Sequence, residues 1–282
     1  MIIAVSDTHL GYDQSDSTNF LKLINSELMN LSKNDHLVLL GDILEFWRGR
    51  NIDAIFPNYR KDNKKDNKEE INEQILSRII ELNKKTNVHY IIGNHDYTVI
   101  NFLNNYNKNF QDNKYPLDIR KFLRLQDGNL KIFFIHGYQF EVIASLEPLT
   151  IEDYERICTY LCDRTGNLIG KKLSFLWDLF NNSLNLLKLR RSSLFKIGSI
   201  TKPPEERKEN IDRIESIVES IAFRQLFFGI KDDEFLIFGH THRPFINIDK
   251  KVVNSGSWLK YAEKHNSYVK IENDTVELLY YK

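Results

Sequence analysis

Five short polar clusters, most of them placed directly after an apolar run, constrain this chain more than any other feature. The apolar runs span residues 2–5, 37–40, 90–92, 132–135 and 235–238, and each is short enough for a buried strand. The clusters hold Asp, Asn, Gly and five of the eight histidines. In open α/β sheets, ligands bind beyond the carboxyl ends of the strands. We therefore expect all five clusters to meet at one sheet edge.

The side chains of these clusters have the chemistry of metal ligands. Carboxylates, one amide oxygen and several neutral imidazoles suit Mn, Fe, Zn or Ni better than Ca or Mg. A single such residue would more often be a turn, cap or hydrogen-bonded loop residue. Seven potential ligands at strand ends are improbable by chance, so the pattern favours a site for two metal ions. The clusters are Asp7-Thr8-His9, Gly41-Asp42, Gly93-Asn94-His95-Asp96, His136-Gly137 and Gly239-His240-Thr241-His242.

In this order, the five blocks resemble the signature of the calcineurin-like metallophosphoesterase superfamily, and they span residues 7–242. The resemblance implies an α/β fold of the four-layer αββα type, in which two mixed sheets are flanked by helices. We expect a single domain over residues 1–282. The stretch between His136 and His240 carries no metal motif and has a mostly helical pattern, so we expect a helical cap insertion at about 141–228 that selects the substrate.

The resemblance also implies two divalent metal ions, expected to be Mn²⁺, with Fe, Zn or Ni as alternatives. A hydroxide that bridges the two ions would be the nucleophile, attacking a phosphate ester or pyrophosphate bond. In this family arrangement Asp42 bridges the ions. The first metal is held by Asp7, His9 and His242, and the second by Asn94, His136 and His240.

His95 is assigned a different role, because its neighbour Asn94 already occupies the ligand position. A leaving alkoxide needs a proton, and an imidazole is suited to supply it, so we expect His95 to be the general acid. Asp96 has two interpretations. It could hold the His95 ring in one tautomer, which would make it part of the catalytic pair, or it could cap the following helix.

Within the family, the motifs are most similar in sequence to those of the UDP-2,3-diacylglucosamine pyrophosphatase branch. The similarity lies in residues 6–11, 41–47 and 239–244. That branch usually has Arg at the position of His95 and Asp at the position of Tyr138. His95 instead matches general phosphodiesterases and phosphatases of the family. The expected substrate is therefore a small phosphate ester or a nucleotide-linked molecule, with a UDP-sugar lipid pyrophosphatase acting at the membrane surface as the first alternative.

Two further alternatives come from other classes. Residues 7–12 are also similar to double-strand-break repair nucleases, but the chain lacks the length for their additional regions. Lys and Arg number 39 and are balanced by 39 Asp and Glu, so no net charge favours nucleic acid. A non-catalytic scaffold would be expected to lack a ligand, whereas every predicted ligand position is intact. A nuclease is therefore the second alternative, after the UDP-sugar lipid pyrophosphatase, and a scaffold is the third.

Residues 168–197 are apolar on more than one helical face. Because polar residues interrupt the run, its pattern does not predict a membrane-spanning helix. Three interpretations stay open: a helix buried in the cap, which we favour, a homodimer contact, and a groove for an acyl chain. Flanking cations could face a phosphate or an anionic membrane surface, or only keep a helix soluble. They are Lys171, Lys172, Lys188, Arg190, Arg191 and Lys196.

Composition bounds the remaining questions. Hydrophobic residues make up 41% and charged residues 28%, which is ordinary for a soluble globular protein. Cys158 and Cys162 are spaced i, i+4 on a predicted helix, and we expect buried free thiols. The first predicted strand begins at residue 2 and leaves no room for a signal peptide, so we expect a cytoplasmic location.

The rest of the chain predicts ordinary α/β elements. Apolar periodicity predicts helices near 17–31 and 71–82 and one helix over about 205–223. Strands near 245–248, 251–254, 267–271 and 276–281 are expected to form an antiparallel closing meander. The remaining histidines, His36, His89 and His265, are expected to have structural roles only.

Overall fold

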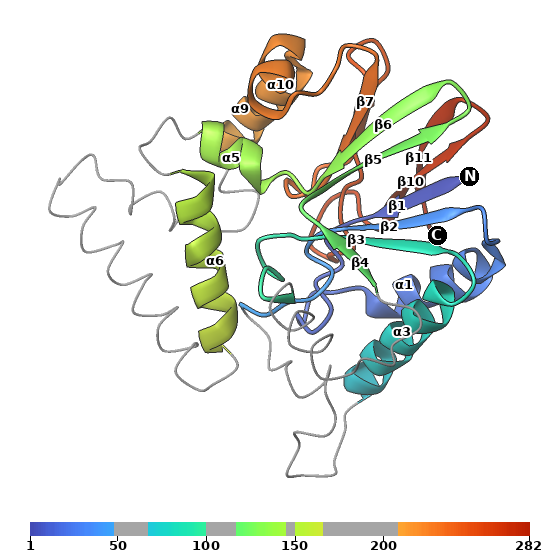
Figure 1. The fold of residues 1–282 in the computed structure, drawn as a ribbon. Helices are drawn as coiled ribbons and strands as arrows, with labels where there is room; N and C mark the ends of the chain where they lie inside the picture. Colours follow the sequence, from blue (N-terminus) through green and yellow to red (C-terminus); the bar gives the residue numbers. More distant parts are fainter. Residues whose placement is uncertain (48–66, 100–116, 145–149, 166–207) are drawn as a thin grey trace, which may run out of the picture.

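A computed structural model describes residues 1–47, 67–99, 117–144, 150–165 and 208–282 (Figure 1). The described residues form two sheets that face each other. One sheet has six strands in the order β11-β10-β1-β2-β3-β4, and the other has five in the order β5-β6-β7-β9-β8. Helices cover the outer faces of both sheets.

The six-stranded sheet is parallel at its centre. It contains β1 (Ile2–Val5), β2 (His36–Leu40), β3 (Asn87–Ile91), β4 (Asp118–Arg120), β10 (Ser267–Glu272) and β11 (Thr275–Tyr280). The first four strands pair in parallel, so their carboxyl ends share one edge. The last two pair antiparallel and extend the sheet on the far side of β1. This topology brings the loops after β1, β2 and β3 together.

The five-stranded sheet has the same mixed character. It contains β5 (Phe122–Asp127), β6 (Leu130–Ile135), β7 (Glu234–Phe238), β8 (Phe245–Asn247) and β9 (Val252–Asn254). The three central strands, β6, β7 and β9, pair in parallel, while β5 and β8 are antiparallel edge strands. The loops after β6 and β7 therefore end at a common edge.

The helices form the two outer layers. They are α1 (Ser17–Ser26), a short 3₁₀ helix η1 (Leu28–Asn30), α3 (Asn67–Asn83), α5 (Tyr138–Ala144), α6 (Ile151–Thr165), α9 (Lys208–Glu219) and α10 (Ile221–Phe228). In Figure 1, α1 and α3 lie along the six-stranded sheet, whereas α5 and α9 lie on the side of the five-stranded sheet. The predicted four-layer αββα sandwich is confirmed.

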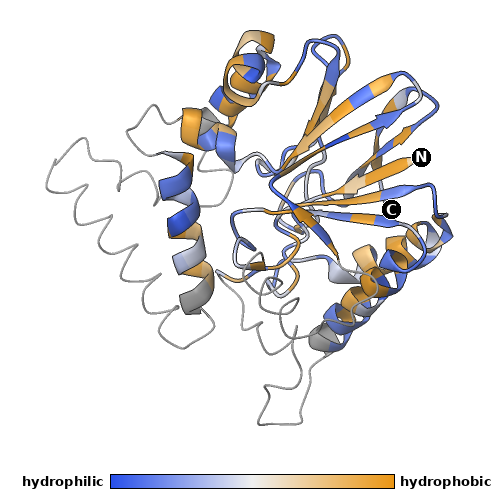
Figure 2. Cartoon of the chain, in the orientation of Figure 1, coloured by the Kyte–Doolittle hydropathy of each residue, from blue (hydrophilic) through white to orange (hydrophobic). Residues whose placement is uncertain are grey.

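Strand alternation explains the layers. In β1, Ile2 and Ala4 pack between the two sheets, and Ile3 and Val5 pack under the helices. Successive strand side chains point to opposite faces, and these strands are apolar on both faces because both faces are covered. Figure 2 shows the same pattern, with the strands mostly apolar and the helices apolar along one side. The central strands of the sheets are thus buried on both sides.

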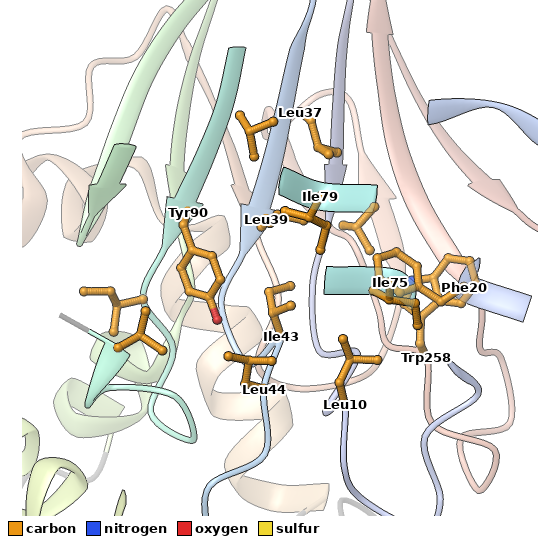
Figure 3. Close-up of a cluster of buried hydrophobic side chains, with 14 of the residues drawn as sticks. Leu10, Phe20, Leu37, Leu39, Ile43, Leu44, Ile75, Ile79, Tyr90 and Trp258 are labelled. Atoms are coloured by element: carbon orange, nitrogen blue, oxygen red, sulfur yellow. The ribbon is translucent and has the colours of Figure 1, made fainter. Parts of the chain in front are cut away.

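The core continues into the loops that carry the polar clusters. Leu10, Ile43 and Leu44 lie in the loops after β1 and β2, and each is at most 6% exposed. Figure 3 shows them close to Tyr90 and Leu39 in one hydrophobic cluster. Because buried apolar side chains resist displacement, this packing holds the loop backbones in fixed positions.

Two predictions about secondary structure are wrong. The expected helix over 205–223 is two helices, because Ser220 leaves the helical conformation and its Oγ accepts from Phe223 N, which caps the start of α10. The expected closing meander is two separate hairpins. Strands β8 and β9 join the five-stranded sheet, whereas β10 and β11 join the six-stranded sheet. The alternation of apolar and polar residues predicts a strand but does not indicate which sheet the strand joins.

The region expected to form a cap holds α5, α6, α9 and α10. The whole apolar run at 168–197 lies in the interval 166–207, outside the described residues, so its three interpretations stay predictions. Cys158 and Cys162 lie on α6, and both are buried thiols outside any disulfide, as predicted. No helix within the described ranges is long and apolar enough to cross a membrane.

Candidate metal centre

Backbone hydrogen bonds join the loops that carry the predicted ligands. After β1, Asp7 N donates to Gly41 O at 3.0 Å and His9 N donates to Asp42 O at 2.9 Å, which ties the first loop to the second. On the other sheet, Gly239 N donates to His136 O at 2.8 Å. The loops therefore form one connected edge rather than independent segments.

A first group of ligand atoms comes from Asp7, His9 and His242, which are all buried and whose atoms lie within 4.8 Å of one another. His242 Nε2 lies 3.1 Å from Asp7 Oδ1 and 3.3 Å from His9 Nε2. These residues follow β1 and β7, so the group spans both sheets. They are the three residues predicted to hold the first metal.

A second buried group comes from Asp42, His136 and His240, again within 4.8 Å. Asp42 Oδ2 lies 3.3 Å from His136 Nε2 in this group and 3.8 Å from His9 Nε2 in the first. Asp42 therefore faces both groups, which is the position expected of a bridging carboxylate.

Each of the two aspartates uses one oxygen to hold the loops and turns the other toward the histidines. Asp42 Oδ1 accepts from His95 N at 2.8 Å, and its Oδ2 faces His136. Asp7 Oδ2 accepts from His240 N at 2.9 Å, and its Oδ1 faces His242. The hydrogen bonds fix the orientation of each carboxylate.

Several buried polar atoms at this edge are suited to bind a cation. Within the described part of the chain, Asp7 Oδ1, Asn94 Oδ1 and His136 Nε2 make no hydrogen bond although they are buried. Buried polar atoms without a partner are costly and rare in native proteins, so each requires an explanation. A divalent cation coordinated by these atoms would satisfy them, and the donor set of oxygen and imidazole nitrogen fits such an ion.

The backbone is strained where the ligands lie. Of nine described non-glycine residues with positive φ, five are predicted ligands: Asp7, His9, Asp42, His240 and His242. Such conformations cost about 1–3 kcal/mol each and cluster at functional sites. The strain therefore independently marks the same edge.

Two glycines allow the ligands to come close. A Cβ atom at Gly93 would collide with Asp42 Oδ1, and one at Gly239 would collide with Asp7 Oδ2. Any larger residue at either position would push a predicted ligand away from the cluster. Close packing against Asp42 and Asp7 therefore explains why glycine occupies these two motif positions.

Charge inside the cluster shifts the pKa values in opposite directions. Burial raises the pKa of Asp42, but the surrounding histidines, His136 first, lower it more, so it lies below the usual range. Burial lowers the pKa of His9, but the nearby carboxylates of Asp7 and Glu45 raise it to about 10. The pKa of His136 is raised to about 9, chiefly by Asp42 against burial. The negative field that binds protons here would also attract a metal cation.

His95 lies beside the first group, where Glu45 and Trp47 hold it. Its Nδ1 lies 2.8 Å from Glu45 Oε1, and its ring stacks on Trp47 with centroids 4.1 Å apart. Burial lowers the pKa of His95 below its ordinary value, although Glu45 opposes this. A lowered pKa makes the protonated ring a better proton donor.

The prediction that Asp96 holds the His95 ring is wrong. Its Oδ1 accepts from Gly93 N at 2.8 Å, and its Oδ2 accepts from Ile43 N at 2.8 Å and from Tyr90 Oη at 2.6 Å. These bonds tie the loop after β3 to the loop after β2. Asp96 therefore holds loops together, and the carboxylate that contacts the ring is Glu45.

Sequence reasoning missed three side chains that contact predicted ligands. Glu45 Oε2 lies 2.9 Å from His9 Nδ1, Glu141 Oε2 lies 2.7 Å from His240 Nε2, and Tyr261 Oη lies 3.3 Å from His242 Nδ1. Ligand histidines commonly donate their second N–H to a carboxylate or another oxygen. Only Glu45 had a sequence signal, because it lies three residues after Asp42 in the second motif.

Comparisons with known proteins agree with the motif. A family model described as calcineurin-like phosphoesterase matches residues 1–244. Solved structures that match include Vacuolar Protein Sorting 29 from Cryptosporidium parvum, at 12% identity and TM-score 0.36, covering 99% of this chain and 94% of that chain. A single mutant of Vps29 from Entamoeba histolytica matches at 12% identity and TM-score 0.33, covering 99% and 96%.

The two structural matches are too distant to carry an argument about this chain, and the search of curated proteins found no match. The family match stands on its own, since it spans well over half of the sequence and includes all five motif blocks. The chain belongs to the calcineurin-like phosphoesterase family.

Proposed function

We propose that the chain is a binuclear metal-dependent phosphoesterase that hydrolyses a phosphate ester or pyrophosphate bond. The observation that carries the proposal is two neighbouring buried ligand groups, in which Asp42 Oδ2 of the second group lies 3.8 Å from His9 Nε2 of the first. Asp7, His9 and His242 would hold one cation, and Asn94, His136 and His240 the other. Mn²⁺ is the expected metal, because the mixed donor set suits it.

Two divalent cations held there would supply positive charge against the phosphate oxygens and would acidify a water molecule. The protein's own contribution begins with orientation. Asp7 and Asp42 each keep one oxygen fixed by a backbone N–H, so the remaining oxygen has a defined direction. Pre-oriented charges lose little free energy to reorganisation during a reaction.

His95 is proposed to protonate the leaving group. Glu45 accepts the Nδ1–H of His95, so Nε2 is the nitrogen that carries the transferable proton. Glu45 is fully buried and its pKa lies well below the ordinary value, mainly because His95 and His9 outweigh its burial. It therefore stays ionised and keeps the ring in one orientation.

The test is a panel of substrates given to the metal-loaded protein. An aryl phosphate monoester, an aryl phosphate diester, UDP-sugars with and without acyl chains, and single-stranded DNA separate the candidate classes. Hydrolysis of at least one substrate that requires added metal supports the proposal. If the chain binds two metal ions but hydrolyses none of these substrates, it behaves as expected of a non-catalytic scaffold.

A UDP-sugar lipid pyrophosphatase is the second candidate, and the wording of residues 6–11 and 41–47 favours it. Its signature would be cleavage of the acylated UDP-sugar in preference to the form without acyl chains. Equal rates on both forms would leave the general phosphoesterase as the better description.

A further inference from the structure

Glu141 is a buried carboxylate behind the second ligand group, and no step of the proposed reaction uses it. It lies on α5, which begins two residues after His136, and it is 7% exposed. Its Oε2 lies 2.7 Å from Nε2 of His240. The helix that follows one predicted ligand thus brings a carboxylate to another ligand from a different strand.

The chemistry of imidazole gives this contact a consequence. A neutral ring carries one N–H, and a carboxylate accepts hydrogen bonds but cannot donate them. With Nε2–H donated to Glu141, Nδ1 is left unprotonated and is the ring atom available as a ligand in the group with Asp42 and His136. A distance of 2.7 Å is in the range of strong, charge-assisted hydrogen bonds.

The support behind Glu141 is rigid. Its neighbours on α5, Phe140 and Ala144, are buried in the cluster between α5, α9 and the five-stranded sheet. Ala144 O also accepts from Arg213 Nη1 at 3.2 Å, which ties α5 to α9. Movement of Glu141 away from His240 would disturb this packing, so the contact is a fixed feature of the fold.

The first ligand group contains the same arrangement. Glu45 Oε2 lies 2.9 Å from Nδ1 of His9, and Glu45 is fully buried. Two carboxylates from different parts of the chain therefore each contact one predicted ligand histidine, one in each group. The repetition indicates that the Glu141 contact serves the ligand and is more than an incidental contact.

We propose that Glu141 is a positioning residue for the second metal ion, which acts by holding His240 with Nδ1 free to bind. This inference rests on the proposed function, because it needs the second cation. It predicts that loss of Glu141 weakens one of two metal sites and leaves the other intact. A general loss of folding would weaken both.

The experiment is a titration of metal-free protein with Co²⁺, followed by visible absorption and by equilibrium dialysis. The variants are Glu141→Ala and Glu141→Gln. The matched control is Glu234→Gln, because Glu234 is also buried, lies at the start of the strand that leads to His240, and pairs with Arg124 at 2.8 Å. Circular dichroism of each metal-free protein checks that it folds.

In Glu141→Ala we expect one of the two Co²⁺ affinities to fall by about 10- to 100-fold, with a changed absorption band, while the other site keeps its affinity. Glu141→Gln replaces the carboxylate by a neutral amide, whose weaker hydrogen bond is expected to lower the same affinity by less than in Glu141→Ala. The control is expected to bind both ions like the wild type.

Unchanged binding of both ions by Glu141→Ala would overturn the inference and leave the proposed function standing. If Glu141→Ala does not fold, unchanged binding by Glu141→Gln overturns it in the same way. A wild-type chain that binds no Co²⁺ would overturn both proposals, so the two failures are distinguishable.

Discussion

The two sheets contribute different chemistry to the candidate centre. The loops of the six-stranded sheet supply all the predicted oxygen ligands, namely Asp7, Asp42 and Asn94, together with His9. The loops of the five-stranded sheet supply only imidazoles, from His136, His240 and His242. Neither sheet holds a complete ligand set, so the centre exists only where the two edges face each other.

This division has a physical consequence. The six-stranded sheet carries the negative charge of Asp7 and Asp42, and His242 and His136 of the other sheet lie against these carboxylates across the interface. Burying charges without partners would be expensive. Bound cations would therefore stabilise the contact between the sheets as well as supply chemistry.

The largest effect is expected from Asp42→Ala, which removes the one carboxylate that faces both groups. Turnover of the best substrate in the panel should fall below detection, measured with saturating Mn²⁺. The control is Asp35→Ala. Asp35 precedes β2, whereas Asp42 follows it, and Asp35 pairs with the amino terminus at 3.2 Å. Wild-type turnover in Asp42→Ala would reject the bridging role.

Replacement of His95 should be the next largest effect. His95→Asn is expected to slow turnover by about 10²- to 10⁴-fold, the usual contribution of a general acid, while two metal ions remain bound. His89→Asn is the control, because His89 lies on β3, the strand that leads to His95, and contacts Asp118 at 2.7 Å. A variant of His95 that loses metal along with activity would make the residue a ligand instead.

Removal of metal should loosen the contact between the sheets. A ligand present at 100 times its dissociation constant stabilises a protein by about 2.7 kcal/mol, so a chelator should lower the melting temperature by several degrees. Differential scanning calorimetry with and without Mn²⁺ measures the shift. Identical melting curves would show that no cation joins the two sheets.

The smallest effect on turnover is expected from Glu45→Gln. Glu45 contacts His9 and His95, which both lie in loops of the six-stranded sheet. Because Glu45 holds both His9 and His95, turnover and the affinity of the first metal should both fall, by about 10- to 100-fold. Steady-state kinetics and equilibrium dialysis give the two numbers. A loss of turnover with unchanged metal affinity would confine its role to His95.

Much of this arrangement could be predicted from the sequence. The apolar runs before Asp7, Asp42 and His240 form β1, β2 and β7 as expected, because fully buried strands need continuous apolar residues. Parallel pairing then places the following polar residues at one edge. The ligand positions follow from the motif and from this local rule together.

What the sequence could not reveal depends on contacts between distant elements. Glu141 is 99 residues from His240, and nothing in its local sequence distinguishes it from a surface acid. The role of Asp96 was missed for the same reason, since its Oδ2 accepts from Ile43 N, 53 residues away in the loop after β2. Strands β4 and β5 were also missed, because several of their residues are exposed and their pattern is weak.

The most direct test of the central claim is the number of metal ions per chain. The metal-free protein would be saturated with Mn²⁺, dialysed and measured by elemental analysis, with Asp42→Ala as the comparison. Two ions per wild-type chain and fewer in the variant are predicted. A wild-type chain that retains no Mn²⁺, and none of Fe, Zn or Ni supplied in the same way, would contradict the account.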